Sequence, residues 1–349
     1  MAYATINDPS AHFQNVAWTG DGNSTKAITN TGNSNLQPDW VWLKNRTDAE
    51  NNTLADTTRG VTKRLVSNTT AAEDTNGIAS VQSDGFTVSA SYNGNTNAKN
   101  YVAYQWKANG GTTSSNSSGS ITSTVQANTT AGFSIVSYTG NGTAGATIGH
   151  GLGVAPSWII VKQKDATRDW NVFHHKNTSE PETDFLVLNS TDATADATNR
   201  WNDTMPSSSV ITIGDTSRVN ESSGSYIMYV FAEKQGYSKF GSYKGNSNAD
   251  GTFVYLGFKP AWLMVKRTSN TGTWLIWNNA SDTYNMTSQA LKANTNNAQT
   301  SGYWNIDFLS NGFKLRAIDN ELNGGATFVY AAFAAEPLVG TNNVFSLAR

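Results

Sequence analysis

One nine-residue phrase occurs three times in this chain, and it limits the possible fold more than any other feature. The copies read LQPDWVWLK at residues 36–44, VAPSWIIVK at 154–162 and FKPAWLMVK at 258–266. Proline fixes its own φ and cannot donate to a sheet, so it belongs at a strand start or edge. The apolar run after it has the length of a strand buried over most of its course and ends in a lysine. The phrase therefore predicts the core strand of a repeated unit.

Two further landmarks recur in the same order, which distinguishes a true repeat from coincidence. An aromatic residue followed by a glycine turn precedes each copy of the phrase, at Trp18, Tyr138 and Tyr243. An alternating aromatic strand follows each copy, at residues 101–106, 226–231 and 328–333. We therefore expect three copies of one fold, with equivalent positions for Pro38, Pro156 and Pro260.

The composition agrees with an all-β fold. Charged residues make up only 14% of the chain, against about 25% in an average protein. The 40 asparagines, together with many Ser, Thr and Gly residues, favour turns and loops over helices. Aromatic residues, at 11%, supply large surfaces for burial between those turns. We predict three tandem units of the β-sandwich or jelly-roll type.

The landmarks place these units, called units 1, 2 and 3 below, at residues 11–109, 131–235 and 236–336. Residues 110–130 are rich in Gly, Ser and Thr, which predicts a flexible linker between units 1 and 2. Within that stretch, Ile121 and Val125 leave open the alternative of an edge strand. Residues 337–349 follow the last core strand as a C-terminal tail.

Charge and composition exclude several classes of function. The net charge is −2 and the isoelectric point is near 6.1, so the chain lacks the basic surface expected of a nucleic-acid-binding protein. It has no cysteine, which excludes a disulfide scaffold and thiol chemistry. No window approaches 18 apolar residues, so we expect no membrane insertion. The N-terminal residues lack a basic region followed by an apolar stretch, and we expect no signal peptide.

The residues that usually carry catalysis are not arranged for it. His174 and His175 are adjacent, so in a strand they point to opposite faces and cannot share one metal ion. A glycosidase needs two carboxyl groups held across a sugar, and no spacing favours any pair among Glu180, Glu182, Asp184, Asp192 and Asp196. We predict no catalytic residues, no metal site and no cofactor, and therefore a protein that is not an enzyme.

The aromatic residues are the feature with the most potential for binding, because their faces stack on sugar rings. Trp40, Trp158 and Trp262 recur in the repeated phrase, so we expect them in the core. Trp42 and Trp277 fall outside the shared pattern. They are our candidates for exposed contacts with a glycan.

Several phrases resemble one protein family. They are GFSIVSYTG at residues 132–140, GHGLG at 149–153, FAEKQGYSKFGSY at 231–243, DGTFVY at 250–255 and PLVGTNN at 337–343. The family comprises virion structural proteins encoded by tailed phages, many of them marine, and the resemblance covers essentially the whole chain. Its members are variously labelled tail fibre, appendage or capsid-associated.

This resemblance implies a structural protein on the outer surface of a phage virion, made in the host cytoplasm, which acts by assembly and adhesion. Its partners would be other virion proteins and host surface glycans. One alternative is a glycan-binding adhesin whose main role is host recognition. Another is a polysaccharide-degrading spike, although we find neither a long shaft nor a carboxylate-lined groove in the sequence.

The C-terminal tail carries apolar residues on an otherwise polar stretch: Leu338, Val344, Phe345 and Leu347. Exposed apolar groups usually mark a contact surface. We therefore expect the tail to contact a neighbouring subunit in a homo-oligomer, and the resemblance favours a trimer. The alternative is a tail that folds back on unit 3.

Overall fold

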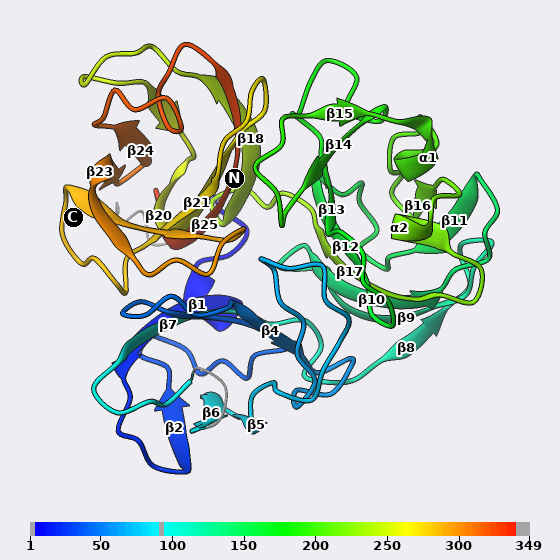
Figure 1. The fold of residues 1–349 in the computed structure, drawn as a ribbon, viewed down its shortest axis with the longest axis horizontal. Coiled ribbons are helices and arrows are strands. Elements are labelled where there is room, and N and C mark those ends of the chain that lie inside the picture. The colour runs from blue at the N-terminus through cyan, green and yellow to red at the C-terminus, as the bar shows by residue number, and fades with distance from the viewer. Residues whose placement is uncertain (1–3, 91–93, 340–349) are drawn as a thin grey trace.

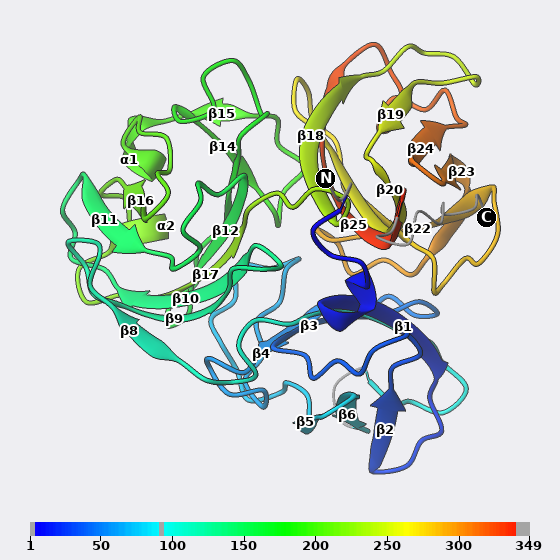
Figure 2. The same cartoon turned by 180° about the vertical axis from the view of Figure 1, so that it is seen from behind.

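The computed structural model describes residues 4–90 and 94–339, and these are built almost entirely from β-strands. Three lobes surround a common centre (Figure 1). They correspond to unit 1 in blue and cyan, unit 2 in green, and unit 3 in yellow to red. The view from behind shows the same three-lobed arrangement (Figure 2). The prediction of an all-β fold with three units is confirmed.

Unit 1 begins with a short 3-10 helix, η1 (Pro9–Ala11). Its strands are β1 (Phe13–Thr19), β2 (Thr25–Thr29), β3 (Trp40–Asn45), β4 (Thr53–Asp56), β5 (Ser80–Gln82), β6 (Gly85–Ser89) and β7 (Asn100–Trp106).

Unit 2 and the stretch before it contain β8 (Ser114–Asn116), β9 (Ser123–Asn128), β10 (Phe133–Thr139), β11 (Ala146–Gly149), β12 (Trp158–Gln163), β13 (Asn171–His174), β14 (Asp184–Val187), β15 (Ala195–Asp196), β16 (Val210–Ile213) and β17 (Ser225–Phe231). Two single-turn helices, α1 (Thr198–Trp201) and α2 (Ser217–Asn220), lie between the later strands.

Unit 3 contains β18 (Ser238–Lys244), β19 (Phe253–Tyr255), β20 (Phe258–Arg267), β21 (Trp274–Asn278), β22 (Thr287–Lys292), β23 (Thr300–Leu309), β24 (Gly312–Leu315) and β25 (Thr327–Pro337).

The three units share one antiparallel topology. In each unit, the last strand lies between the first strand and the strand of the repeated phrase. The strand of the repeated phrase also pairs with the strand that follows it in the sequence. The orders are β1-β7-β3-β4, β10-β17-β12-β13 and β18-β25-β20-β21. A second pair of strands recurs as β2-β6, β11-β16 and β19-β24. The outer strands differ, because only units 2 and 3 extend the common part into eight-stranded sheets.

The strand register confirms that the prolines occupy equivalent positions. The tryptophan two residues after each proline lies opposite the last aromatic residue of the final strand, in the pairs Trp40–Trp106, Trp158–Phe231 and Trp262–Phe333. In unit 3 the strand begins before the proline, and the register shifts at Pro260. A bulge is where a sheet tolerates a residue without an N–H group.

The predicted linker is wrong. Residues 114–128 form the β8–β9 hairpin, which adds to the sheet of unit 2 through β10. Ile121 and Val125 are buried on one side of it, as the edge-strand alternative required. Just before the hairpin, the carboxylate of Asp39 accepts bonds from the backbone N–H groups of Gly110 (2.9 Å) and Gly111 (2.7 Å). The glycines therefore form a tight turn, and the serines lie on an exposed strand face.

The strand of the repeated phrase is buried on both faces, since alternate residues enter two different cores. Trp40 and Trp42 face the centre of the molecule, whereas Val41 and Leu43 face the sandwich core of unit 1. Units 2 and 3 repeat this alternation in β12 and β20. This explains why the phrase is apolar throughout and does not alternate with polar residues.

The central core is shared by all three units. Trp40 of unit 1 stacks on Tyr229 of unit 2, with ring centroids 4.2 Å apart. Trp262 of unit 3 meets Trp106 of unit 1 edge to face at 5.7 Å, and lies 6.4 Å from Trp158 of unit 2. The three units are therefore packed into one body and are not separate domains along the chain.

We predict that replacing Trp158 or Trp262 with Ala lowers the free energy of unfolding by roughly 3–5 kcal/mol, the usual cost of removing a buried aromatic ring. Because the core is shared, the whole chain should still unfold in one transition at a lower temperature, which calorimetry measures. Tyr303→Ala, at a side chain 67% exposed, is the control and should melt like the wild type. Separate melting of one unit would contradict the shared core.

Candidate functional site

The lysine that ends each repeated phrase is buried where two units meet. Lys44, Lys162 and Lys266 are each 1% exposed or less. Each ammonium donates to a carbonyl six residues further along its own unit, at Glu50 (2.8 Å), Arg168 (2.6 Å) and Gly272 (2.8 Å). Each also reaches a carbonyl in another unit, at Thr295 (3.2 Å), Thr70 (2.9 Å) and Thr191 (3.2 Å) respectively. Unit 1 thus binds unit 3, unit 2 binds unit 1, and unit 3 binds unit 2, which closes a ring.

Burial changes the acidity of these lysines, because it disfavours the charged form. It lowers the pKa of Lys44 to about 7 and the pKa values of Lys162 and Lys266 to about 8. An ammonium has three donors and no acceptor, so a cluster of backbone carbonyls suits it. These buried lysines therefore bind backbone carbonyls of two units at once and hold the units together.

A second set of contacts follows the same ring. Trp170 of unit 2 donates its indole N–H to the carbonyl of Val66 in unit 1 (2.9 Å), and Trp274 of unit 3 donates to Val187 in unit 2 (3.0 Å). Both tryptophans lie eight residues after the lysine of their unit. In unit 1 this position is Asn52, whose amide donates to the carbonyl of Thr295 in unit 3 (3.1 Å).

The prediction that Trp42 and Trp277 are exposed is wrong, because both side chains are fully buried. Trp42 faces the central core and donates to Asn52 Oδ1 (3.0 Å). Trp277 lies in the core of unit 3 and donates to the carbonyl of Trp304 (2.8 Å). Neither side chain can stack on a glycan at the surface.

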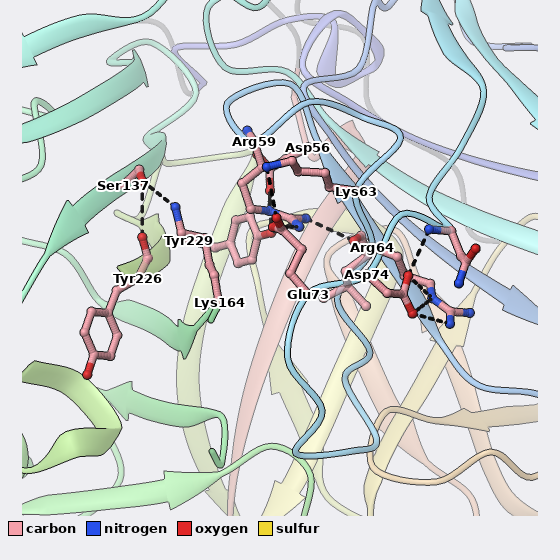
Figure 3. Close-up of polar contacts among 12 residues, drawn as sticks. Asp56, Arg59, Lys63, Arg64, Glu73, Asp74, Ser137, Lys164, Tyr226 and Tyr229 are labelled. Carbon is pink, nitrogen blue, oxygen red and sulfur yellow. Dashed lines mark hydrogen bonds and ion pairs between the residues drawn. The ribbon is translucent and has the colours of Figure 1, made fainter. Parts of the chain in front are cut away.

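A buried charge network joins units 1 and 2 (Figure 3). The guanidinium of Arg59 binds the carboxylates of Asp56 and Glu73 and the carbonyl of Leu54. From unit 2, the hydroxyl of Tyr229 donates to the carboxylate of Asp56 (2.7 Å). Asp56 and Arg59 are 0% and 1% exposed at their side chains, so each charge depends on the others for its hydrogen bonds.

The acidities in this network follow from its contacts. Burial acts to lower the pKa of Arg59, but the carboxylates of Asp56 and Glu73 and the tyrosine outweigh it, and the pKa rises. Burial also raises the pKa of Tyr229 well above its ordinary value of 10. The tyrosine is therefore a neutral donor to Asp56, and Arg59 is a charged donor to it.

His174 and His175 link unit 2 to unit 3. The Nε2 atoms of the two rings lie 3.0 Å from the carbonyl of Tyr330 and 2.6 Å from that of Phe240. Nδ1 of His174 accepts from the backbone N–H of Lys176 (3.1 Å), so the proton of the neutral ring is on Nε2. Burial lowers the pKa of His174 to about 3, which keeps it neutral.

The candidate carboxylates lie around one hairpin of unit 2. Asp184 and Asp196 are opposite each other in β14 and β15, and Asp184 is buried and accepts a bond from Thr178. Asp192 and Asp196 are exposed. In the described ranges, no group of three His, Asp or Glu side chains comes together as a metal site.

Residues 8–337 match the model of a protein family described as Domain of unknown function (DUF7483). The chain belongs to this family. The match begins just before η1 and ends with β25, so the family domain comprises all three units together. Searches of the curated proteins and of the solved structures found no significant match. No helix in residues 4–90 and 94–339 is long and apolar enough to cross a membrane.

The surface of this family domain carries aromatic side chains that the sequence reasoning missed. Phe253 and Tyr255 of β19 are 44% and 46% exposed, and Tyr284 and Tyr303 of unit 3 are 77% and 67% exposed. The alternation Phe253-Val254-Tyr255, with the valine buried, is the signal of a half-buried strand that could have identified the first pair.

The predicted contact residues of the tail lie mostly outside the described residues. This applies to Val344, Phe345 and Leu347. Leu338 is half-buried and its backbone N–H donates to the carbonyl of Gly257 (3.3 Å) within unit 3. The oligomer contact stays a prediction.

We predict that raising the pH from 7 to 9 stabilises the fold. In this range the unfolded chain holds more protons on Lys44, Lys162 and Lys266 than the folded chain, so the free energy of unfolding rises with pH. The slope should be on the order of 1 kcal/mol per pH unit, measured by chemical denaturation. Lys44→Met should reduce this slope without abolishing it, because Lys162 and Lys266 still contribute, and Lys244→Met, at an exposed position, should leave it unchanged. An unchanged slope in Lys44→Met would show that the carbonyls keep this ammonium charged.

We predict that Arg59→Met destabilises the fold by about 3–5 kcal/mol, because it leaves the carboxylate of Asp56 buried without its partner. Tyr229→Phe should cost about 1–3 kcal/mol, the penalty for removing one donor from a buried acceptor. The double variant Arg59→Met with Asp56→Asn should be less unstable than the sum of its single variants, which chemical denaturation can test. Additive losses would mean that the two charges do not depend on each other.

Proposed function

We propose that this protein is a structural component of the outer surface of a tailed-phage virion, and that it acts by assembly and adhesion. The resemblance to phage virion proteins supports the virion assignment. The observation that carries the structural role is the closed ring of inter-unit contacts, in which one lysine from each unit binds the next. These contacts make three units into one body of fixed shape.

A fixed shape is what a particle component exposed to the environment requires. The central core excludes water and the ring of lysines fixes the order of the units, so no unit can leave without exposing the aromatic centre. The outer faces of the three units are then free to contact other virion proteins. A homo-trimer stays a prediction for this assembly, and its partners are expected to be virion proteins.

The glycan-binding adhesin is the second candidate, and one observation favours it. Exposed aromatic rings at Phe253 and Tyr255 border a groove between units 2 and 3. The side chains expected for this role, Trp42 and Trp277, are buried, but the surface offers these others. Adhesion to a host glycan is compatible with a structural role in the same particle.

We predict that antibodies against the purified protein label the outer surface of intact phage particles in electron micrographs. Pre-incubation of the antibody with the purified protein is the control and should remove the label. Antigen found in infected cells but absent from purified particles would contradict the virion assignment. Release of reducing sugar from host polysaccharide, abolished by replacing one Asp or Glu, would instead establish the polysaccharide-degrading spike.

A further inference from the structure

Two neighbouring hollows lie at the surface between units 2 and 3, and together they are called the groove below. The first, of about 590 Å³, is lined mainly by hydroxyl-bearing residues, and the second, of about 440 Å³, lies beside β19. Lys176 and Ser242 line both hollows, so the two hollows lie side by side. The lining residues of unit 2 lie mainly on the loops between β13 and β14 and between β14 and β15, and those of unit 3 include residues of β18 and β19. Volumes of this size are typical of ligand sites in proteins.

The hydroxyl-lined end of the groove is held in place by the backbone. The N–H of Thr194 in unit 2 donates to the carbonyl of Thr268 in unit 3 (2.9 Å), which joins the two walls. Asn177 lines this end and is 97% buried, with 3% of its surface exposed. Its Oδ1 accepts from the hydroxyl of Thr194 (2.7 Å), while its Nδ2 has no partner among the described residues. A buried amide donor without a partner calls for an acceptor.

The aromatic end of the groove is a two-ring platform. Phe253 and Tyr255 are two residues apart in β19, so both rings stand on the same face, about 7 Å apart along the strand. Strand β19 is the edge of its sheet, and the two rings are 44% and 46% exposed. Lys239 donates to the carbonyl of Tyr255 (2.8 Å), and its ammonium lies 5.4 Å from the centre of the tyrosine ring. This contact holds the ring beside the groove.

Charged and polar groups stand between the two ends. Lys176 and Ser242 are exposed. Glu233 lies 3.8 Å from Nε2 of His175, and both line the aromatic end. The groove therefore offers donors, acceptors and aromatic faces in a row, with one acidic side chain and two lysines.

From this arrangement we infer that the groove between units 2 and 3 binds a glycan chain. Alternating hydroxyl groups and apolar ring faces are the chemistry of a sugar, and the groove presents groups that match both. Single-stranded nucleic acid also stacks on aromatic rings, but it requires a more strongly basic groove than two lysines opposed by Glu233 provide. This inference rests on the adhesive part of the proposed function and gives that part a location.

The full-length protein on an array of neutral, uronic-acid and sulfated oligosaccharides tests the inference, followed by titration calorimetry with the strongest ligand. Tyr255→Ala and Phe253→Ala should each weaken binding roughly ten-fold, as expected for the loss of a stacking ring. Ser242→Ala should weaken it less. Tyr303→Ala, which removes an exposed aromatic ring that is not among the groove-lining residues, is the matched control and should bind like the wild type. Unchanged melting temperatures of the variants exclude misfolding.

Two outcomes would overturn the inference. One is no binding to any glycan on the array or to purified surface polysaccharide of the host bacterium. The other is binding that Tyr255→Ala and Phe253→Ala leave intact, which would place the glycan elsewhere. Neither outcome affects antibody labelling of particles, so failure of the groove and failure of the virion assignment can be told apart.

Discussion

The burial of one strand on both faces is the constraint on which the rest of this structure depends. In each unit the strand of the repeated phrase gives alternate residues to its own sandwich and to the common centre, so neither core is complete without the other. The centre also contains unsatisfied donors: the indole N–H groups of Trp40, Trp106 and Trp262 have no acceptor among the described residues. Such groups cost free energy when buried. The perpendicular contact of the Trp106 and Trp262 rings, at 89°, is a geometry in which an aromatic face can partly take the place of an acceptor.

An apolar centre alone would not fix how the units are arranged, since hydrophobic contacts are non-directional. The buried polar groups supply that direction. Each lysine of the ring has carbonyl acceptors in one particular neighbour, and Tyr229 fits the carboxylate of Asp56 in unit 1 only when units 1 and 2 are correctly aligned. Buried charges add little net stability in comparison with well-packed apolar residues. We therefore interpret them as the groups that specify the order of the units around the centre.

Much of the fold could be predicted from the repeated phrase, but the surfaces that pack against its strand could not. A continuous apolar run shows that a strand is buried on both faces without showing what covers them, so the shared centre was missed. The constant lysine was a signal for it, because a charge kept in all three copies at the end of a buried strand needs a common acceptor. A departure from the repeat does not by itself indicate exposure, because Trp42 is buried in the central core and donates to Asn52 there. The β8–β9 hairpin was missed because Ser and Thr on an exposed edge strand have the composition of a linker.

The three boundaries between the units differ in the hollows that they carry. Side chains in the central core pack against all three units, which restricts the substitutions possible there. The hollows at the unit boundaries do not have this restriction, so they can differ from one another. Between units 1 and 3 the hollow is lined by small residues such as Ala261 and Ala334, and between units 1 and 2 by Arg168 and Arg218. Only the groove between units 2 and 3, among the hollows described here, combines an exposed two-ring platform with a buried amide that lacks a partner. A position at which one unit differs from the other two is thus informative about function only when the burial of its side chain is known. Trp42 is such a position, but it is buried and its difference has a structural cause.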